Sequence, residues 1–323
     1  MKISPELRAG PSLPGDIKFD TAILAGTRSP NAIAQYAHYF RQYLAYATSF
    51  AQALDPATLI RWRSDLVNTP YITKAGPHHY SVNAINVRLS AIRSMMYEAA
   101  NQGYISPSLA QAFGEIEGIK AGAMQDRCNP NARVPLTPAQ MRTICDAPDL
   151  NSLAGTMHRA FLSTLAGSGL RVSEAVTLMT SQIEWGIDKQ QRAGFAVLVT
   201  NKTSTQLEPR PLSLEAYLRI QQWLNARTVS SSYIFTGFSG RGDRGPLTTS
   251  IRPVSAWEMV RRYARQVGIE HVKPHDFRRF VATQLAEFDS GLVQKALGHK
   301  RLAPALNAYA QDELARGITD NLY

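Results

Sequence analysis

A small set of basic side chains in the second half of the chain has the types and spacing to bind an anion. Arg171 opens an expected helix in GLRVSEAVTL, and Glu174 follows one turn later on the same face, where it can hold the guanidinium. His275 and Arg278 lie three residues apart at the start of another expected helix, PHDFRRFVATQLA. The helix dipole and the free backbone N–H groups favour negative charge at such positions. These residues predict a phosphate site, with a surface ion pair and a capping histidine as the alternatives.

Three further residues would turn a phosphate site into a reactive one. Lys202 lies in a polar turn, VTNKTSTQ, and His299 and Tyr309 lie in LGHKRLAPALNAYAQ. Taken singly, a turn lysine is usually solvated, and most tyrosines are packing residues. The sequence has no metal-ligand cluster, no nucleotide-binding loop and no serine nucleophile motif. A phenol beside several cations therefore predicts nucleophilic attack on a phosphodiester, with no metal and no cofactor.

Helical periodicity covers most of the chain and would position these residues. Apolar residues recur at helical spacing in four segments of the N-terminal part, which are 30–47, 56–67, 81–103 and 106–113. No strand pattern occurs before residue 130. Further along, FAVLVT and EPRPLSL predict a hairpin that encloses NKTSTQL, and SYIF predicts another short strand. The expected fold is mainly α with one small antiparallel β-sheet.

Composition and periodicity divide the chain into two expected domains and two connecting segments. Residues 1–28 are rich in Pro and Gly and are expected to form a flexible arm. Residues 29–120 are expected to form a helical domain, and the polar segment 121–136 a linker. Residues 137–323, with Thr137 as the first N-cap, would form the second domain and carry all the reactive residues.

The charge of the chain indicates its partner. The 323 residues include 35 Lys and Arg against 25 Asp and Glu, a net charge of +10, which favours a polyanion, with nucleic acid ahead of a membrane. A merely soluble basic protein is the alternative. The sequence has no run of 18 apolar residues and no signal peptide, and Cys128 and Cys145 form no disulfide framework. A cytoplasmic protein associated with the nucleoid is therefore expected.

The motifs taken together resemble the tyrosine recombinases of the phage integrase family, which includes Cre and the Xer proteins. The resemblance rests on GLRVSEAVTL, on PHDFRR followed by AT, and on LGH followed by a late tyrosine. It spans most of the chain, with a helical core-binding domain over about residues 28–120 and a catalytic domain from about residue 134 onward. It implies that the catalytic positions are Arg171, Lys202, His275, Arg278, His299 and Tyr309, with Glu174 in support. His299 and Tyr309 are ten positions apart, where the family commonly has nine, and Pro304 lies between them.

The resemblance implies a specific chemistry. The two arginines and His299 would bind the non-bridging oxygens of a DNA phosphate while Tyr309 attacks it and forms a 3′-phosphotyrosyl link. His275 would assist removal of the phenol proton, and Lys202 would protonate the departing 5′-oxygen. The substrate would be double-stranded DNA recombination sites, bound by a homotetramer in which the two domains of each chain clamp the duplex. A type IB topoisomerase and a catalytically inactive DNA-binding protein are the alternatives.

Two surface features complete the expectations. Several arginines are expected to contact DNA phosphates rather than read bases, with a solvated helix face as the alternative: Arg241, Arg244, Arg252, Arg261, Arg262, Arg265 and Arg279. In the tail after Tyr309, Leu314 and Ile318 recur at helical spacing. The tail is expected to dock on a neighbouring subunit, with docking on its own subunit as the alternative. Tyr323 is the only later tyrosine and a poor candidate for a positioned attack.

Overall fold

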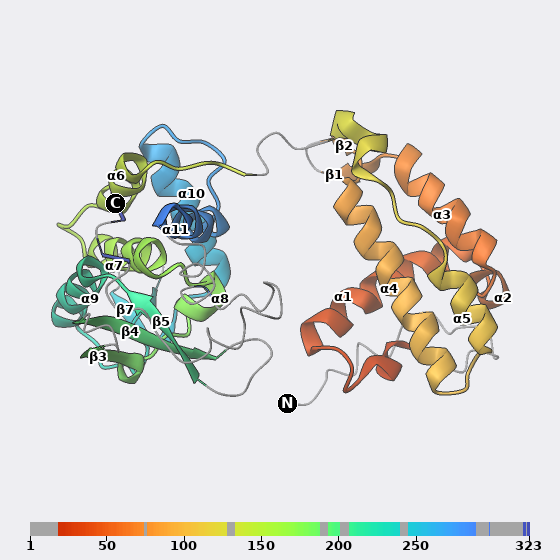
Figure 1. Ribbon diagram of the computed structural model, residues 1–323, viewed down its shortest axis with the longest axis horizontal. Coiled ribbons are helices and arrows are strands. Elements are labelled where there is room, and N and C mark those ends of the chain that lie inside the picture. The colour runs from red at the N-terminus through yellow and green to blue at the C-terminus, as the bar shows by residue number, and fades with distance from the viewer. Residues whose placement is uncertain are drawn as a thin grey trace. The chain divides into compact units, whose positions relative to one another are not determined.

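The structure of the chain is a computed structural model that divides into two compact units, Met1–Asn129 and Pro130–Tyr323 (Figure 1). The residues that it describes are 19–73, 76–127, 133–187, 193–200, 207–239, 245–288, 297, 319–320 and 322–323. Within these ranges, helices predominate and the sheets are small and antiparallel, which confirms the predicted fold class. In the same ranges, no helix combines the length and the apolar character needed to cross a membrane.

The first unit is built from helices. Its described elements are η2 (Thr21–Leu24), α1 (Pro30–Ala47), α2 (Phe50–Ala53), α3 (Pro56–Asn68), β1 (Tyr71–Thr73), β2 (Gly76–His78), α4 (Val82–Asn101), α5 (Pro107–Gly114) and η3 (Ala121–Arg127). Serine caps explain where two long helices begin: Ser29 Oγ accepts from the N–H of Ala32 at 3.4 Å, and Ser81 Oγ accepts from that of Ala84 at 3.2 Å. Both helix starts were predicted from the sequence.

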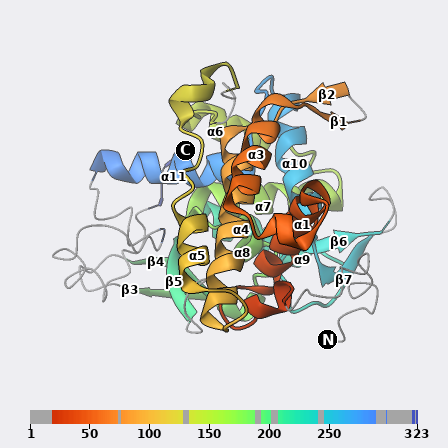
Figure 2. The ribbon, with the colours of Figure 1, turned by 90° about the vertical axis from the view of Figure 1, so that its right-hand side faces the viewer.

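Helix α4 forms the centre of the first unit. It contacts α1, α3 and α5, which lie around it (Figure 2). Its inward face is fully buried and has the helical spacing that the sequence predicted, with Ile85, Leu89, Ile92 and Met96 in the core. This packing shows how an amphipathic pattern becomes a helical domain, because each neighbouring helix buries its own apolar stripe against α4.

Three expectations for the first unit were wrong in part. Residues 19–28 were assigned to a loose arm, yet Phe19 and Leu24 are buried in the core of this unit. Residues 121–127 were assigned to the linker, yet they form η3, with Met124 buried in the same core. Strands β1 and β2 form an antiparallel hairpin where no strand was expected. They were missed because each has three residues, which is too short to show an alternating pattern.

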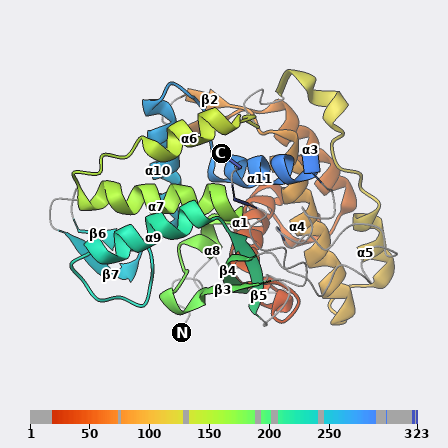
Figure 3. The same ribbon diagram turned by 60° about the vertical axis from the view of Figure 1, so that its left-hand side comes forward.

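The second unit places helices around small sheets. Its described elements are α6 (Pro138–Asp146), α7 (Leu153–Ser168), α8 (Val172–Ala175), η4 (Thr180–Gln182), β3 (Ile183–Ile187), β4 (Ala193–Thr200), β5 (Leu207–Leu212), α9 (Leu214–Ala226), β6 (Thr236–Phe238), β7 (Pro246–Ser250), α10 (Pro253–Gln266) and α11 (Pro274–Phe288). Helix α7 contacts α6, α9 and α11 (Figure 3). It is buried along most of its length, so it forms the rigid centre on which the other elements are built.

The sheets of the second unit confirm one strand prediction and correct another. Strands β4 and β5 pair antiparallel, with Thr200 opposite Leu207, as the hairpin prediction required. The third strand of this sheet, β3, was not predicted, and neither was β7. SYIF was wrong as a strand: Tyr233 makes only an isolated bridge to Met179, and β6 begins at Thr236. Its apolar residues Ile234 and Phe235 are instead buried in the core.

The described end of the tail packs against its own unit. Thr319, Leu322 and Tyr323 are buried, and the N–H of Leu214, at the start of α9, donates to Asp320 Oδ1 at 2.6 Å. The sequence instead favoured docking on a neighbour and left docking on the same subunit as the alternative. Leu314 and Ile318, on which the helical prediction for the tail rested, lie outside the described residues.

Candidate active site

The turn between α7 and α8 brings the first site residue into place. Gly169 ends α7 in the left-handed conformation, with φ of 64°, and its N–H donates to Leu165 O at 3.0 Å. A Cβ atom at this position would lie 2.5 Å from Cδ2 of Leu297, which is too close for any side chain. Glycine is therefore required here both by the backbone and by the approach of Leu297. The turn places Arg171 at the N-cap of α8.

Glu174 fixes Arg171 at two points. Arg171 NH1 donates to Glu174 Oε1 at 2.7 Å, and the backbone N–H of Arg171 donates to Glu174 Oε2 at 2.7 Å. The side chain of Glu174 is only 12% exposed, whereas that of Arg171 is 30% exposed. The carboxylate thus lies behind the guanidinium, and part of the guanidinium stays accessible to an anion. The sequence predicted this contact from the spacing of three residues.

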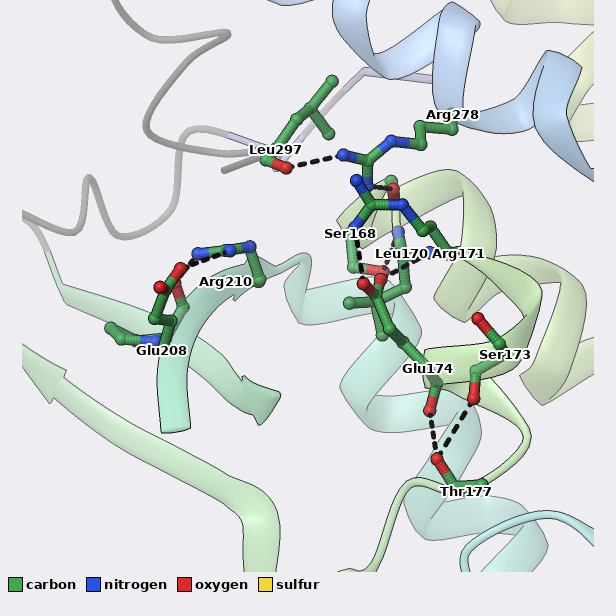
Figure 4. A network of polar contacts seen from close by, with 12 residues as sticks. Ser168, Leu170, Arg171, Ser173, Glu174, Thr177, Glu208, Arg210, Arg278 and Leu297 are labelled. Atoms are coloured by element: carbon green, nitrogen blue, oxygen red, sulfur yellow. Dashed lines mark hydrogen bonds and ion pairs between the residues drawn. The ribbon is translucent and has the colours of Figure 1, made fainter. Parts of the chain in front are cut away.

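Arg278 is a buried cation held by two backbone carbonyl groups. It is 4% exposed, and it donates to Gly169 O at 2.7 Å through NH1 and to Leu297 O at 2.5 Å through NH2 (Figure 4). Burial, together with the positive charge of Arg171, lowers the pKa of Arg278 to about 10. Two guanidinium groups with one supporting carboxylate leave a net positive charge that an anion would neutralise.

His275 lies in the first turn of α11 and is exposed. Its pKa is lowered, first by partial burial and then by the positive charges of Arg279 and Arg278. The neutral imidazole is therefore favoured, which is the form that accepts a proton. Arg279 NH1 donates to the buried carboxylate of Asp276 at 2.9 Å. This ion pair within α11 partly neutralises the positive charge of Arg279.

Five of the predicted catalytic and DNA-contacting residues lie outside the described residues: Lys202, Arg241, Arg244, His299 and Tyr309. Described residues flank two of the segments that contain them. Thr200 and Leu207, which flank the segment with Lys202, pair with each other. Leu297, two residues before His299, is buried and bonded to Arg278. Leu297, the last described residue before His299, therefore lies at the arginine pair.

The arginines of α10 do not form one uniform face. Arg261 lies over the ring of Trp257 at 4.7 Å. Arg262 instead hydrogen-bonds the Nδ1 atom of His158 and the hydroxyl of Tyr263, both at 3.0 Å. Burial, together with the charge of Arg262, lowers the pKa of His158 to about 3, so His158 is neutral and its Nδ1 can accept. Arg262 thus has a structural role that the sequence did not reveal. Arg252 and Arg265, also in the predicted group, are exposed.

The motifs did not single out Arg210. It lies on β5, and its side chain is buried and paired with Glu208 at 2.7 Å. The only available signal was the alternation in EPRPLSL, which places Arg210 on the same strand face as Leu212. No group of three or more His, Cys, Asp or Glu in the described ranges could hold a metal ion.

Known proteins share both the sequence pattern and the fold. The family model for the phage integrase family matches residues 135–316. The chain is 23% identical over 289 residues to tyrosine recombinase XerA of Pyrococcus horikoshii, an alignment that covers 88% of this chain and 85% of the relative.

Two solved structures share the fold at low sequence identity. XerH recombinase, in a post-cleavage complex with a palindromic difH substrate, has a TM-score of 0.57, with 15% identity and coverage of 86% of this chain and 74% of that one. A lambda integrase tetramer bound to a Holliday junction has a TM-score of 0.53, with 14% identity and coverage of 90% and 75%. Their likeness supports the fold alone.

The match over more than half of the chain defines the class of protein. The chain belongs to the phage integrase family. It is a tyrosine recombinase, an enzyme that cleaves and rejoins DNA strands, as the resemblance in its motifs predicted.

Proposed function

We propose that this chain is a site-specific recombinase that cuts DNA through a 3′-phosphotyrosyl intermediate, with Tyr309 as the nucleophile. The observation that carries the proposal is the pair of guanidinium groups at the end of α7. Arg278 is fixed by Gly169 O and Leu297 O, and Arg171 is fixed by Glu174. Two cations held in this way before substrate arrives suit the transition state of phosphoryl transfer, because they need no reorganisation when charge develops.

The reaction follows from the chemistry of these groups. Arg171 and Arg278 bind the non-bridging oxygens of the scissile phosphate. The oxygen of Tyr309 attacks phosphorus in line, a new P–O bond forms, and the bond to the 5′-oxygen of the next nucleotide breaks. An unperturbed phenol has a pKa of about 10, so it must lose its proton as it attacks. His275 serves as the acceptor, since its lowered pKa favours the neutral ring.

The leaving group needs a proton, and the two remaining polar residues complete the site. Lys202 protonates the departing 5′-oxygen, and His299 donates a hydrogen bond to a non-bridging oxygen. The covalent phosphotyrosyl bond conserves the energy of the broken bond. A 5′-hydroxyl from a second duplex then attacks the phosphotyrosine, releases Tyr309 and joins the new strands.

Tyr323 is unsuited to the role of nucleophile. Its ring is buried, its hydroxyl donates to Ser163 O at 3.4 Å, and its backbone oxygen accepts from Arg142. Burial raises the pKa of Tyr323 well above the usual value. A phenol in this environment resists ionisation and is packed against α7, which supports Tyr309 instead.

The proposed assembly is a homotetramer on two double-stranded recombination sites, with the two units of each chain clamping the duplex. The net charge of +10 supports a duplex partner. We further propose that the enzyme acts on nucleoid DNA in the cytoplasm. The exposed arginines Arg252, Arg262 and Arg265, together with Arg241, Arg244, Arg261 and Arg279, are proposed to contact DNA phosphates.

A covalent selection tests the proposal without knowledge of the DNA site. The protein is incubated with random-sequence duplexes that carry a nick, so that the short product strand diffuses away and the adduct accumulates. Adducts that resist denaturation are expected from the unchanged protein and not from Tyr309→Phe, and their sequences are expected to converge on one site. The absence of adduct from the unchanged protein would contradict the enzymatic proposal. Adducts without sequence enrichment, together with relaxation of any supercoiled plasmid, would favour a topoisomerase.

A sulfur-substituted substrate tests the role of Lys202 separately. DNA with sulfur in place of the bridging 5′-oxygen has a leaving group of much lower pKa, which needs no general acid. Lys202→Ala is expected to cleave ordinary DNA at least about 100-fold more slowly and the sulfur-substituted DNA at a nearly normal rate. Tyr309→Phe is the control and should cleave neither. An equal defect of Lys202→Ala on both substrates would remove Lys202 from this role.

A further inference from the structure

Arg210 is a buried cation outside the proposed catalytic set. Only 7% of its surface is exposed, although it lies on the short strand β5. Its NH2 donates to Glu208 Oε2 at 2.7 Å, and its NH1 donates to Pro209 O at 3.1 Å. These two contacts hold the guanidinium of Arg210 in one orientation. The side chain of Glu208 is 33% exposed, so this ion pair lies at the edge of the buried region.

Strand β5 places Arg210 near the end of α7. Alternation along β5 places Glu208, Arg210 and Leu212 on one face, and Leu212 is fully buried in the core. The next residue, Ser213, donates its N–H to Gly167 O at 3.0 Å. A Cβ atom on Gly167 would lie 2.1 Å from Ser213 Oγ, so α7 and the residue that follows β5 are in close contact. The inner face of β5 is thus fixed against the helix end that precedes Arg171.

The same helix end holds the arginine pair. Gly169 O accepts from Arg278, and Arg171 begins the next helix. Figure 4 shows Arg210 and Glu208 beside this network, on the side where Leu297 approaches Arg278. The positive charge of Arg210 also lowers the pKa of Arg278, after burial and the charge of Arg171. Three guanidinium groups therefore share one electrostatic environment.

We propose that Arg210 is a third guanidinium group of the phosphate site, which stabilises the negative charge that develops on the scissile phosphate. The inference rests on the proposed function. Glu208 orients Arg210 on β5 as Glu174 orients Arg171 on α8, through a carboxylate contact of 2.7 Å in each case. A fixed positive charge lowers the barrier when it interacts more strongly with the transition state than with the bound DNA.

The test compares two substrates in single-turnover cleavage of nicked DNA that carries the selected site. One has an ordinary scissile phosphate, and the other has a methylphosphonate, which lacks one negative charge. Arg210→Met keeps the side-chain stem and removes the charge. It is expected to form adduct about 10- to 30-fold more slowly on the phosphate, while DNA affinity changes less than about threefold. On the methylphosphonate, the rate of adduct formation by Arg210→Met should lie within about threefold of that of the unchanged protein, because the charge that Arg210 stabilises is absent.

A second buried arginine provides the matched control. Arg219 is also 7% exposed and is paired with Asp146 at 2.7 Å, on the face of α9 that contacts α7. Arg219→Met is expected to lower the melting temperature without any difference between the two substrates. An Arg210→Met deficit of equal size on both substrates, or no deficit on the phosphate, would overturn the inference.

Two outcomes keep the proposals separate. If the unchanged protein forms no adduct, the proposed function fails; if it forms adduct and Arg210→Met matches it, only the role of Arg210 fails. Should Arg210→Met not fold, Arg210→Lys and Arg210→Gln replace it. The lysine variant is expected to cleave the phosphate at least about fivefold faster than the glutamine variant. Equal rates of the two variants would overturn the inference.

Discussion

Substitution of Gly169 by alanine should damage stability and activity together. The backbone at Gly169 has φ of 64°, a conformation that costs an alanine about 1 kcal/mol. The added Cβ would lie 2.5 Å from Cδ2 of Leu297 and 3.2 Å from Cγ1 of Val281. Both neighbours are buried, so relieving the overlap costs about a further 1–3 kcal/mol. The total is about 2–4 kcal/mol of unfolding free energy.

Gly268→Ala separates backbone strain from steric overlap. Gly268 also has a positive φ, of 79°, but a Cβ there would meet nothing within 4 Å. This control should therefore lose only about 1 kcal/mol. Urea unfolding followed by tryptophan fluorescence measures both changes, since three of the four tryptophans, Trp185, Trp223 and Trp257, lie in the second unit.

The activity of the same two variants tests the link to the site. Gly169→Ala displaces both Gly169 O and Leu297, which provide the two acceptors of Arg278. Adduct formation is expected to fall more than about 10-fold in Gly169→Ala and to stay unchanged in Gly268→Ala. Equal losses of stability in the two variants, or normal adduct formation by a folded Gly169→Ala, would show that the approach of Leu297 does not position Arg278.

Three other perturbations have defined outcomes. Glu174→Gln keeps the size of the side chain but weakens the bond to Arg171, so single-turnover adduct formation should fall about 10-fold with little change in melting temperature; an unchanged rate would show that Arg171 needs no carboxylate. The cleavage rate should rise with pH through the pKa of His275, with the midpoint below the usual 6.5, because only the neutral ring accepts a proton. The cleavage rate of His275→Gln should not show this rise with pH. If the variant keeps the rise, the titration belongs to another group. Leu24→Ala should lower the unfolding free energy of the first unit by about 2–4 kcal/mol, measured by hydrogen exchange, whereas a loose arm would give no change.

The sequence alone was sufficient for features that depend on near neighbours in the chain. A helix start is predicted where a side-chain oxygen lies three residues before the backbone N–H that it caps. The structure contains this capping hydrogen bond at Ser29, Ser81 and Thr137. The Arg171–Glu174 contact follows from helical spacing in the same way. The family could also be predicted, since its motifs are short runs of residues that carry their own chemistry.

Only the tertiary structure decided which distant groups meet. Arg278 is bonded to Gly169, 109 positions away, and no local pattern indicates that contact. Arg210 resembles an ordinary strand residue until packing of β5 on α7 places it near the arginine pair. The burial of Phe19 and Leu24 was likewise hidden, because a short apolar segment in a region rich in Pro and Gly acquires a partner only when the helices around α4 assemble. Local geometry sets capping and helical spacing, whereas the surroundings of a buried charge are set by the whole fold.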